Sequence, residues 1–237
     1  MFATGSASHS ASRNKKTKGL VFLALSFLFV IPASVFANPR YVQLDLSSHF
    51  NQNHGPDEYG VFVSSLPEGL VTFSSHVPFQ FSREHSVIVQ NNAASLTIDA
   101  VRAKAVHLLI NVGFALTAFL APGERLGKIT LVFDKGQPEI THLVIGANIR
   151  EWRQVGDCGA TVNTLTHSNA NVEVTGKAPN ACDPSFTQDG TGLAVIDRLT
   201  VPVRRKGRTL TGIVVEDLNP FPAAIVFSAI TVEVAPK

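Results

Sequence analysis

Short runs of alternating apolar and polar residues, with little helical periodicity, restrict the fold of this chain more than any other feature. Tyr41–Leu46 places Val42, Leu44 and Leu46 on one face, and Ser95–Val101 repeats the pattern. Pro, Gly, Asn and Ser separate the runs, as expected of antiparallel strands joined by turns. Further strands are expected at Gly60–Val63, Leu70–Phe73, Pro78–Phe81, Ser86–Gln90, Gly192–Val203, Thr209–Leu218 and Ala224–Val234.

The clearest hairpin is formed by Gly127–Asp134 and Glu139–Gly146, which Lys135–Pro138 joins. With about ten short strands and no helical pattern between them, the chain is expected to be all-β, as an antiparallel sandwich or jelly roll. A parallel α/β fold is not indicated, because its crossover connections are usually helices.

The segment Ala105–Ala121 is apolar enough to resemble a membrane span. His107, Asn111 and Gly113 interrupt it, and a polar group at mid-span is costly. We therefore expect Val106–Val112 to be a central strand, buried on both faces and followed by a largely apolar loop. A second membrane span is the alternative.

The N-terminus has the order of a secretory signal peptide. Met1–Gly19 is basic without an acid, Leu20–Ile31 is an apolar run, and Pro32–Ala37 supplies a break and small residues. Residues 1–37 are expected to be the signal, and residues 38–237 a single β-sandwich domain that is secreted or periplasmic. The alternative is that the signal stays uncleaved as an anchor.

Cleavage after Ala37 changes the charge of the chain. The signal contains four of the 20 Lys and Arg residues and none of the 18 Asp and Glu residues, so the mature chain has a net charge of −2. This balance gives no support for nucleic-acid binding, which needs an excess of basic residues. The one basic run, Arg204–Arg208, reads as a solvated hairpin tip, with an anion site as the alternative.

Cys158 and Cys182 are the two cysteines, and in an oxidising compartment they are expected to form one disulfide. The bond would close a loop of about 25 residues and stabilise the fold by roughly 3 kcal/mol. The polar loop Gly159–Ala181 contains few large apolar residues, so it can bury too little apolar surface to stabilise its own conformation. A metal pair or a redox pair is the alternative, without a CxxC spacing to support it.

The sequence shows no catalytic centre. There is no G-x-S-x-G elbow and no H-E-x-x-H motif, and no spacing singles out a pair of carboxylates. His49 and His54 flank a loop with Asp57 and Glu58, where ordinary loop polarity explains them better than a metal site does. We expect a non-enzyme without a cofactor. Calcium is left open, because backbone carbonyls and single carboxylates can bind it without leaving a motif.

A series of strand ends and turns resembles a known family. Its parts are Val77–Phe81, Ala105–Ile110, Gly127–Phe133, Glu139–Gly146, Ala147–Trp152, Val214–Pro220 and Ile230–Glu233. This order resembles the galactose-binding-like jelly roll of secreted bacterial modules, discoidin-type and similar to carbohydrate-binding modules. The resemblance covers most of Leu44–Val234 and implies a module that binds carbohydrate. The loop between the cysteines does not belong to the pattern.

Gly146–Trp152 is the segment most suited to bind a ligand. Asn148, Arg150 and Trp152 alternate, so an extended backbone would turn all three to one side. Aromatic rings stack on sugars, while amide and guanidinium groups hydrogen-bond hydroxyls. The alternative is a structural role, in which Trp152 fills space in the core or at its rim and Arg150 forms an ion pair with Glu151 or with a residue of a neighbouring strand. The polar loop Asn51–Tyr59 is a second candidate rim.

The expected partner is a carbohydrate or a cell-surface glycan, with no nucleic acid and no membrane contact after signal cleavage. The first alternative is a structural or protein-interaction role in the cell envelope or extracellular matrix, with an extracellular or envelope protein as partner. The second alternative is an enzyme on a sandwich scaffold, which would need ionisable residues to converge in one groove.

Overall fold

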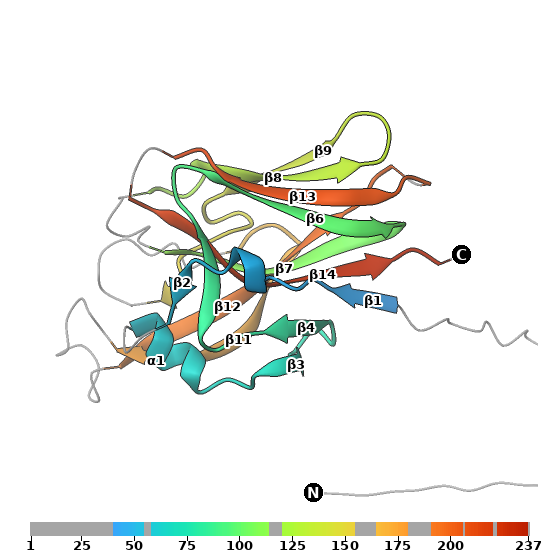
Figure 1. Cartoon of the computed structure of the whole chain (residues 1–237). Coiled ribbons are helices and arrows are strands. Elements are labelled where there is room, and N and C mark those ends of the chain that lie inside the picture. The colour runs from blue at the N-terminus through green and yellow to red at the C-terminus, as the bar shows by residue number, and fades with distance from the viewer. Residues whose placement is uncertain are drawn as a thin grey trace, which may run out of the picture. The chain divides into compact units, whose positions relative to one another are not determined.

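Antiparallel strands make up nearly all of the regular structure, as the alternating pattern predicted. The computed structural model describes residues 40–54, 58–113, 120–154, 165–179, 191–205, 207–219 and 222–236. In these residues the chain is an all-β sandwich with one short α-helix and one turn of 3₁₀ helix (Figure 1). The fold class is confirmed, while the jelly-roll and galactose-binding-like assignments stay predictions.

The larger sheet has eight strands in the order β10-β12-β7-β14-β5-β2, with β1 beside β14 and β11 beside β12. Its strands are β1 (Arg40–Gln43), β2 (Gln52–Asn53), β5 (His85–Val89), β7 (Ala103–Gly113), β10 (Arg153–Gln154), β11 (Ala170–Pro179), β12 (Thr191–Pro202) and β14 (Ala224–Val234). The last strand, β14, is central. It pairs with β7 along its length, and with β5 and β1 through different parts of the strand.

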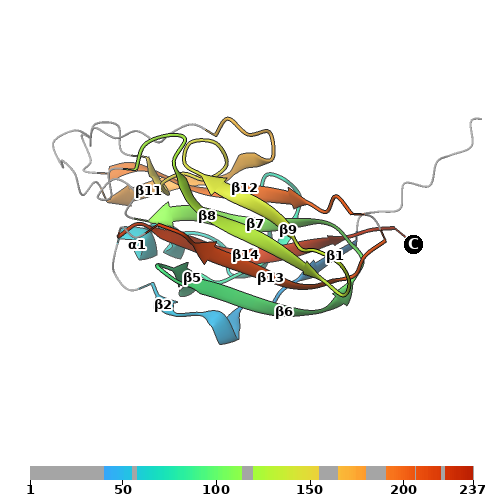
Figure 2. The ribbon, with the colours of Figure 1, turned by 90° about the horizontal axis from the view of Figure 1, so that it is seen from above.

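The smaller sheet has four strands in the order β6-β13-β8-β9. They are β6 (Ala93–Val101), β8 (Arg125–Phe133), β9 (Glu139–Val144) and β13 (Leu210–Asp217). Figure 2 shows this sheet lying over β7 and β14 of the larger one. The predicted hairpin is present as β8 and β9, in the register Ile129↔Thr141.

The main core lies between the two sheets, because alternate residues of both turn inward. Leu108 and Ile110 of β7 pack there with Ile129 of β8 and Ile213 of β13, all within 1% of complete burial. Full burial of a large aliphatic side chain stabilises a fold by about 1.5–3 kcal/mol. Burial of these inward-facing side chains is therefore the principal stabilising contribution in the sandwich.

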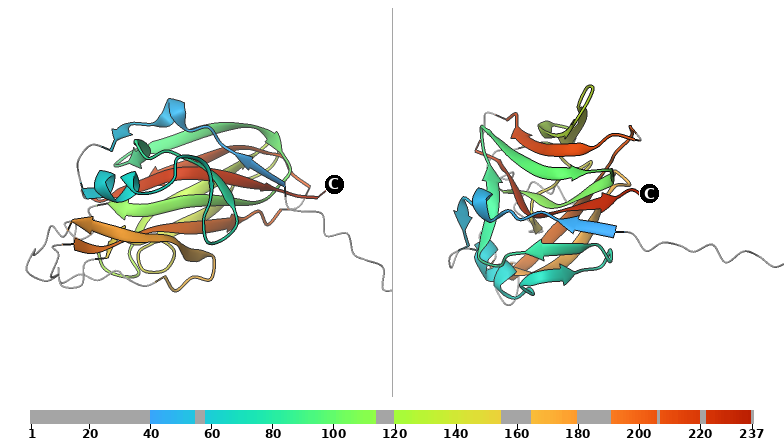
Figure 3. Two further views of the ribbon diagram at one scale, coloured as in Figure 1. Left: turned by 90° about the horizontal axis from the view of Figure 1, so that it is seen from below. Right: turned by 45° about the vertical axis from the view of Figure 1, so that its right-hand side comes forward.

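A third layer covers part of the outer face of the larger sheet. It consists of the hairpin β3 (Gly69–Thr72) and β4 (Pro78–Phe81) with the helix α1 (Glu58–Ser64). Figure 3, left, shows the teal hairpin lying across β7 and β14, while the cyan helix α1 lies toward one end of the sheet and packs against β11. They enclose a second apolar cluster, in which Phe62, Phe79 and Phe81 pack against Leu109 of β7.

The apolar segment that resembled a membrane span begins as β7, between β12 and β14 in the larger sheet. Residues Val106–Val112 are buried, as expected of a central strand covered on both faces. Among the described residues, no helix combines the length and the apolar character that a membrane span needs. Most of the loop that follows, residues 114–119, lies outside the described residues.

Two expectations about local structure are wrong. Gly60–Val63 belongs to the helix α1, not to a strand. Tyr59, Phe62 and Val63 recur at the helical spacing and turn to the second apolar cluster. The β-formers Val61, Phe62 and Val63 obscured that spacing.

The second error concerns the polar loop between the cysteines, which contains the ten-residue strand β11. This strand has few apolar residues, yet it pairs with β12 along most of its length. Backbone hydrogen bonds hold it, with Ala170 and Val174 packed against the two apolar clusters. Cys158 and Cys182 lie outside the described residues, as do the signal residues 1–37, so the disulfide and the signal stay predictions.

Candidate functional site

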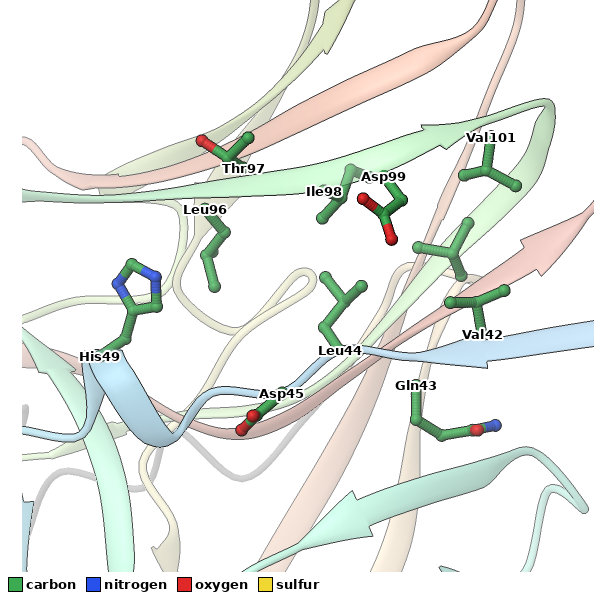
Figure 4. A pocket seen from close by; sticks show the side chains of 11 residues that line it. Val42, Gln43, Leu44, Asp45, His49, Leu96, Thr97, Ile98, Asp99 and Val101 are labelled. Atoms are coloured by element: carbon green, nitrogen blue, oxygen red, sulfur yellow. The ribbon is translucent and has the colours of Figure 1, made fainter.

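A cleft lies at the open side of the sandwich, where the edge strand β6 of the smaller sheet faces β1 of the larger one. Its volume is about 260 Å³, close to the lower limit of small-molecule pockets. Figure 4 shows the residues that line it, which come from the two strands, the residues after β1, the 3₁₀ turn η1 (Ser47–His49) and β14. The lining comprises Val42, Gln43, Leu44, Asp45, His49, Leu96, Thr97, Ile98, Asp99, Val101 and Val232.

The floor of the cleft is the edge of the main core. Leu44 of the chain after β1 and Ile98 of β6 are half-buried and pack against that core. In Figure 4, Leu44 and Leu96 extend into the space between the two strands. The floor therefore offers a small apolar surface on which the C–H face of a ligand can pack.

The rim of the cleft is polar. Asp45, Thr97 and Asp99 are exposed, whereas Gln43 and His49 are half-buried. In Figure 4, His49 and Asp99 turn toward the space between the strands, whereas Gln43, Asp45 and Thr97 turn away from it. The carboxylate of Asp99 and the imidazole of His49 therefore supply acceptors and a donor for ligand hydroxyls. A ligand with an apolar ring face and several hydroxyl groups matches this combination.

Asp45 is held in its charged form. Its Oδ1 accepts the backbone N–H of Ser47 at 2.9 Å. This backbone hydrogen bond lowers the pKa of Asp45, because it favours the carboxylate over the protonated form. Asp45 therefore accepts hydrogen bonds at neutral pH and is not suited to donate a proton as a general acid.

Both strands that border the cleft leave one edge without a ladder partner among the described residues. β6 pairs only with β13, and β1 pairs only with β14. Unpaired edges present backbone N–H and C=O groups that can bond a ligand or an extended chain. The cleft thus combines side-chain groups with backbone groups from two sheets.

Asn148, one of the predicted ligand residues, instead closes the turn that follows β9. Its Oδ1 accepts the backbone N–H of Val144 at 2.8 Å, and its Nδ2 donates to the carbonyl of His142 at 2.9 Å. The side chain is buried. In this structure its amide group stabilises a turn.

Arg150, the second predicted ligand residue, forms a buried ion pair. Its Nε and Nη2 donate to the two carboxylate oxygens of Asp197 on β12, each at 2.8 Å. Asn111 of β7 also donates to Asp197, at 3.0 Å. Burial raises the pKa of Asp197, and the hydrogen bonds from Arg150 and Asn111 oppose that rise.

Trp152, the third predicted ligand residue, packs in the second apolar cluster and is 8% exposed. Its ring stacks with Phe62 at a centroid distance of 6.3 Å and meets the edge of Tyr59 at 5.0 Å. Asn148, Arg150 and Trp152 therefore contact different parts of the protein. Ligand binding by these three residues stays a prediction. The geometry favours the alternative, in which Arg150 forms an internal ion pair and Trp152 fills space in an apolar cluster.

The segment containing these residues fills the space where β7 and β12 diverge. The N–H of Val112 donates to the carbonyl of Arg150 at 2.9 Å, and the N–H of Trp152 donates back to Val112 at 3.1 Å. On its other side, Val195 of β12 donates to Trp152 at 2.8 Å. A two-sided hydrogen-bonded segment of this kind extends the sheet and has its side chains among core residues.

A row of polar residues crosses the outer face of the larger sheet, and sequence reasoning missed it. His107 of β7 lies 3.0 Å from Thr200 of β12 through Nδ1, and 3.5 Å from Glu233 of β14 through Nε2. Lys104 completes this part of the row by pairing with Glu233 at 2.6 Å. The signal that would have revealed it is His107 and Asn111, four residues apart on one face of a strand whose remaining residues after Lys104 are apolar or glycine.

The environment of His107 keeps its imidazole neutral. Burial is the main cause that lowers its pKa, and the positive charge of Arg198 lowers it further. Glu233 opposes this effect by favouring the imidazolium. The side chain is 4% exposed, so the row contributes to packing of the sheet face and is not an open site.

The remaining candidates do not converge on one centre. Asn51, in the second predicted rim, exchanges two hydrogen bonds with the backbone of Ile88, at 2.7 and 2.8 Å. His54 packs against the edge of the Tyr59 ring at 4.8 Å, while Asp57 lies outside the described residues. Across the described part of the chain, no group of three or more His, Cys, Asp or Glu side chains is placed to bind a metal ion.

Compared with known proteins, the chain matches no protein-family model, and no curated protein matches it.

Proposed function

We propose that the chain is an exported, non-catalytic module that binds carbohydrate in the cleft between β1 and β6. The observation that carries the proposal is the apolar floor of the cleft beneath a rim of hydrogen-bonding groups. Sugars present C–H patches between hydroxyls, so one ring can contact Leu44 and Ile98 while its hydroxyls bond Asp99 and His49. The volume of about 260 Å³, at the lower limit of small-molecule pockets, suits a single sugar ring.

Titration calorimetry of the full chain against glycans selected on an array tests this proposal. Asp99→Asn removes one rim carboxylate from an exposed position, so folding is expected to be unaffected. Loss of a charge-assisted hydrogen bond corresponds to about 1.5–3 kcal/mol, or roughly a tenfold to hundredfold weaker affinity. Each titration is made with calcium and with a chelator, because calcium binding is still open.

Glu124→Gln is the matched control, because Glu124 is exposed and does not line the cleft. Its glycan affinity is expected to equal that of the original chain. Absence of binding to every glycan at millimolar concentration, with and without calcium, would overturn the proposal. Equal affinity of the Asp99→Asn variant and the control would show that any binding occurs outside the cleft.

A second candidate function is a structural or protein-interaction role in the cell envelope or extracellular matrix. The free edge of the nine-residue strand β6 favours it, because such an edge can pair with an extended segment of another protein. Light scattering and cross-linking test this role. A strictly monomeric chain with no cross-linked partner would contradict it.

A further inference from the structure

The turns at one end of the sandwich carry basic residues from several parts of the sequence. The β6–β7 turn contains Arg102, the β8–β9 turn contains Lys135, and the β12–β13 turn contains Arg204 and Arg205. Strand β1 begins at this end with Arg40. Figure 1 shows these turns at the end of the sandwich where the C-terminus lies.

Backbone contacts place these turns side by side. Arg40 is in register with Val234 of β14, which is in register with Ala103 of β7. The N–H of Val203 donates to the carbonyl of Lys104 at 2.9 Å, which joins β7 to the β12–β13 turn. Four neighbouring strands span roughly 15 Å, so Arg40, Arg102 and Arg204 belong to one surface.

Glu139 neutralises the β12–β13 turn only in part. Its two carboxylate oxygens accept the backbone N–H groups of Arg204 and Arg205, at 2.9 and 2.8 Å. The two guanidinium groups are exposed and make no hydrogen bond or ion pair with any residue that the structure describes. The backbone of the turn is therefore fixed, while its charges stay available to a ligand.

Arg208 connects this turn to the next one. Its Nη1 donates to the carbonyl of Gln137 at 3.1 Å, and its guanidinium lies 6.0 Å from the centre of the Phe133 ring. Gly136 has a φ of +76°, a conformation that favours glycine, and a Cβ at that position would clash with the guanidinium of Arg208. The β8–β9 turn is thus shaped to fit the arginine, which makes the two turns one continuous surface.

The sequence makes this local charge unusual. The mature chain is acidic overall, with a net charge of −2, yet basic residues are concentrated at this end. Three acids lie at this end, and each already has a partner. Glu139 holds the backbone of the β12–β13 turn, Asp134 accepts the backbone N–H of Thr209 at 3.2 Å, and Glu233 pairs with Lys104. An end that concentrates positive charge on an acidic domain attracts anions.

An anionic polymer fits this surface better than a lipid membrane does. Membrane-surface binding combines charge with inserted apolar side chains. Among the described residues, the exposed large apolar side chains are Val61, Leu70, Val132, Ile140, Val172, Leu193 and Leu218. Val132 and Ile140 lie on the strands that flank the β8–β9 turn, and none of the seven lies within a turn of the basic end. The cleft also leads to this end, because Val101 lines the cleft and Arg102 follows it.

We propose that the basic end, made of Arg40, Arg102, Lys135, Arg204 and Arg205, binds an anionic polysaccharide, one that carries sulfate or carboxylate groups. Guanidinium groups suit this ligand, because their planar donors match the oxygens of a carboxylate or sulfate. The inference rests on the proposed function, because it names the charge class of the glycan. It concerns a surface next to the cleft and not the cleft itself.

The test compares two polymers with the same backbone, dextran sulfate and dextran, for binding to the full chain by affinity electrophoresis. The chain is expected to bind dextran sulfate more tightly, with an affinity that falls about tenfold or more between 50 and 200 mM salt. Arg204→Gln combined with Arg205→Gln is expected to weaken this binding roughly threefold to tenfold. Binding of neutral glycans is expected to be unchanged in this variant.

Arg125→Gln, made in the same assay, is the control for charge alone. Arg125 is exposed at the start of β8, whereas the basic end lies beyond the last residue of that strand, a separation of roughly 27 Å. Equal affinity for dextran sulfate and dextran would overturn the inference, as would an equal loss in the control and the double variant. Stronger binding to phosphatidylglycerol vesicles than to dextran sulfate would overturn it in favour of a membrane surface.

The failure of this inference and the failure of the proposed function give different results. If a neutral glycan binds and Asp99→Asn weakens it, while dextran sulfate shows no preference, only the basic end is refuted. If dextran sulfate binds through Arg204 and Arg205 but no cleft variant affects any glycan, the cleft is refuted and the basic end stands.

Discussion

Replacing Arg150 by Met is expected to destabilise the fold by about 3–5 kcal/mol. The guanidinium holds both carboxylate oxygens of Asp197 at 2.8 Å, and the two side chains are only 7% and 2% exposed. Methionine keeps much of the volume of arginine but none of its donors. The substitution therefore leaves the Asp197 carboxyl buried with Asn111 as its remaining side-chain donor, and an uncompensated buried charge is the main part of the loss.

Removing the carboxylate as well separates the charge effect from packing. In the double variant Arg150→Met with Asp197→Leu, neither charge of this pair is left, so most of the lost stability is expected to return. Arg83→Met is the surface control. Arg83 pairs with Glu68 at 3.3 Å, and both side chains are 46% exposed. Loss of this exposed pair is expected to change stability by about 1 kcal/mol or less.

The sole tryptophan provides the assay. Trp152 is two residues from Arg150 and is buried beside Phe62, so its fluorescence reports the loss of structure directly. Urea unfolding followed at the emission of Trp152 gives the free energy of unfolding from the midpoint and slope. A loss below about 1 kcal/mol for Arg150→Met, or a double variant no more stable than the single one, would refute the reasoning.

Two further predictions concern packing and pH. Gly176→Ala is expected to destabilise the fold by about 1–3 kcal/mol, because a Cβ there would lie 2.5 Å from the Phe62 ring. Adding Phe62→Leu should restore part of that loss in urea unfolding, and full stability of the single variant would contradict the packing. For His107, burial lowers the folded-state pKa, so below the ordinary value of 6.5 the unfolded chain binds a proton that the folded chain does not. Stability is therefore expected to fall as pH drops below 6.5, and less so in His107→Gln, where Glu233, Arg198, Lys104 and Tyr41 still face that position. Identical pH profiles of the urea midpoint would contradict this linkage.

Sequence reasoning recovered most of the strands because sheet burial leaves a simple pattern. Pro78–Phe81 and Ala224–Val234 match their strands in the structure, since inward-facing residues must alternate or form a fully buried run. The helix α1 was missed because β-branched and aromatic residues hid its helical spacing. Strand β11 was missed because backbone pairing with β12, rather than apolar burial, is what holds most of its residues.

The candidate site was much harder to predict. The cleft residues come from β1 and β6, which lie about fifty positions apart and carry no shared motif. Asn148, Arg150 and Trp152 looked suited to bind a sugar because their residue types are suitable, yet residue type does not reveal burial. Arg150 satisfies its charge with Asp197, and that partner could not be identified without the fold.

The central position of β14 has a consequence for how the chain folds. β14 joins β1, β5 and β7 into one sheet, although it follows all the other described strands in the chain. The larger sheet cannot assemble before the C-terminal residues are present, and most of its pairings connect distant parts of the sequence. Such topologies fold in milliseconds to seconds, more slowly than helical proteins of similar stability. Deleting the segment from Ala224 onward is therefore expected to prevent folding of the whole sandwich rather than to trim one edge.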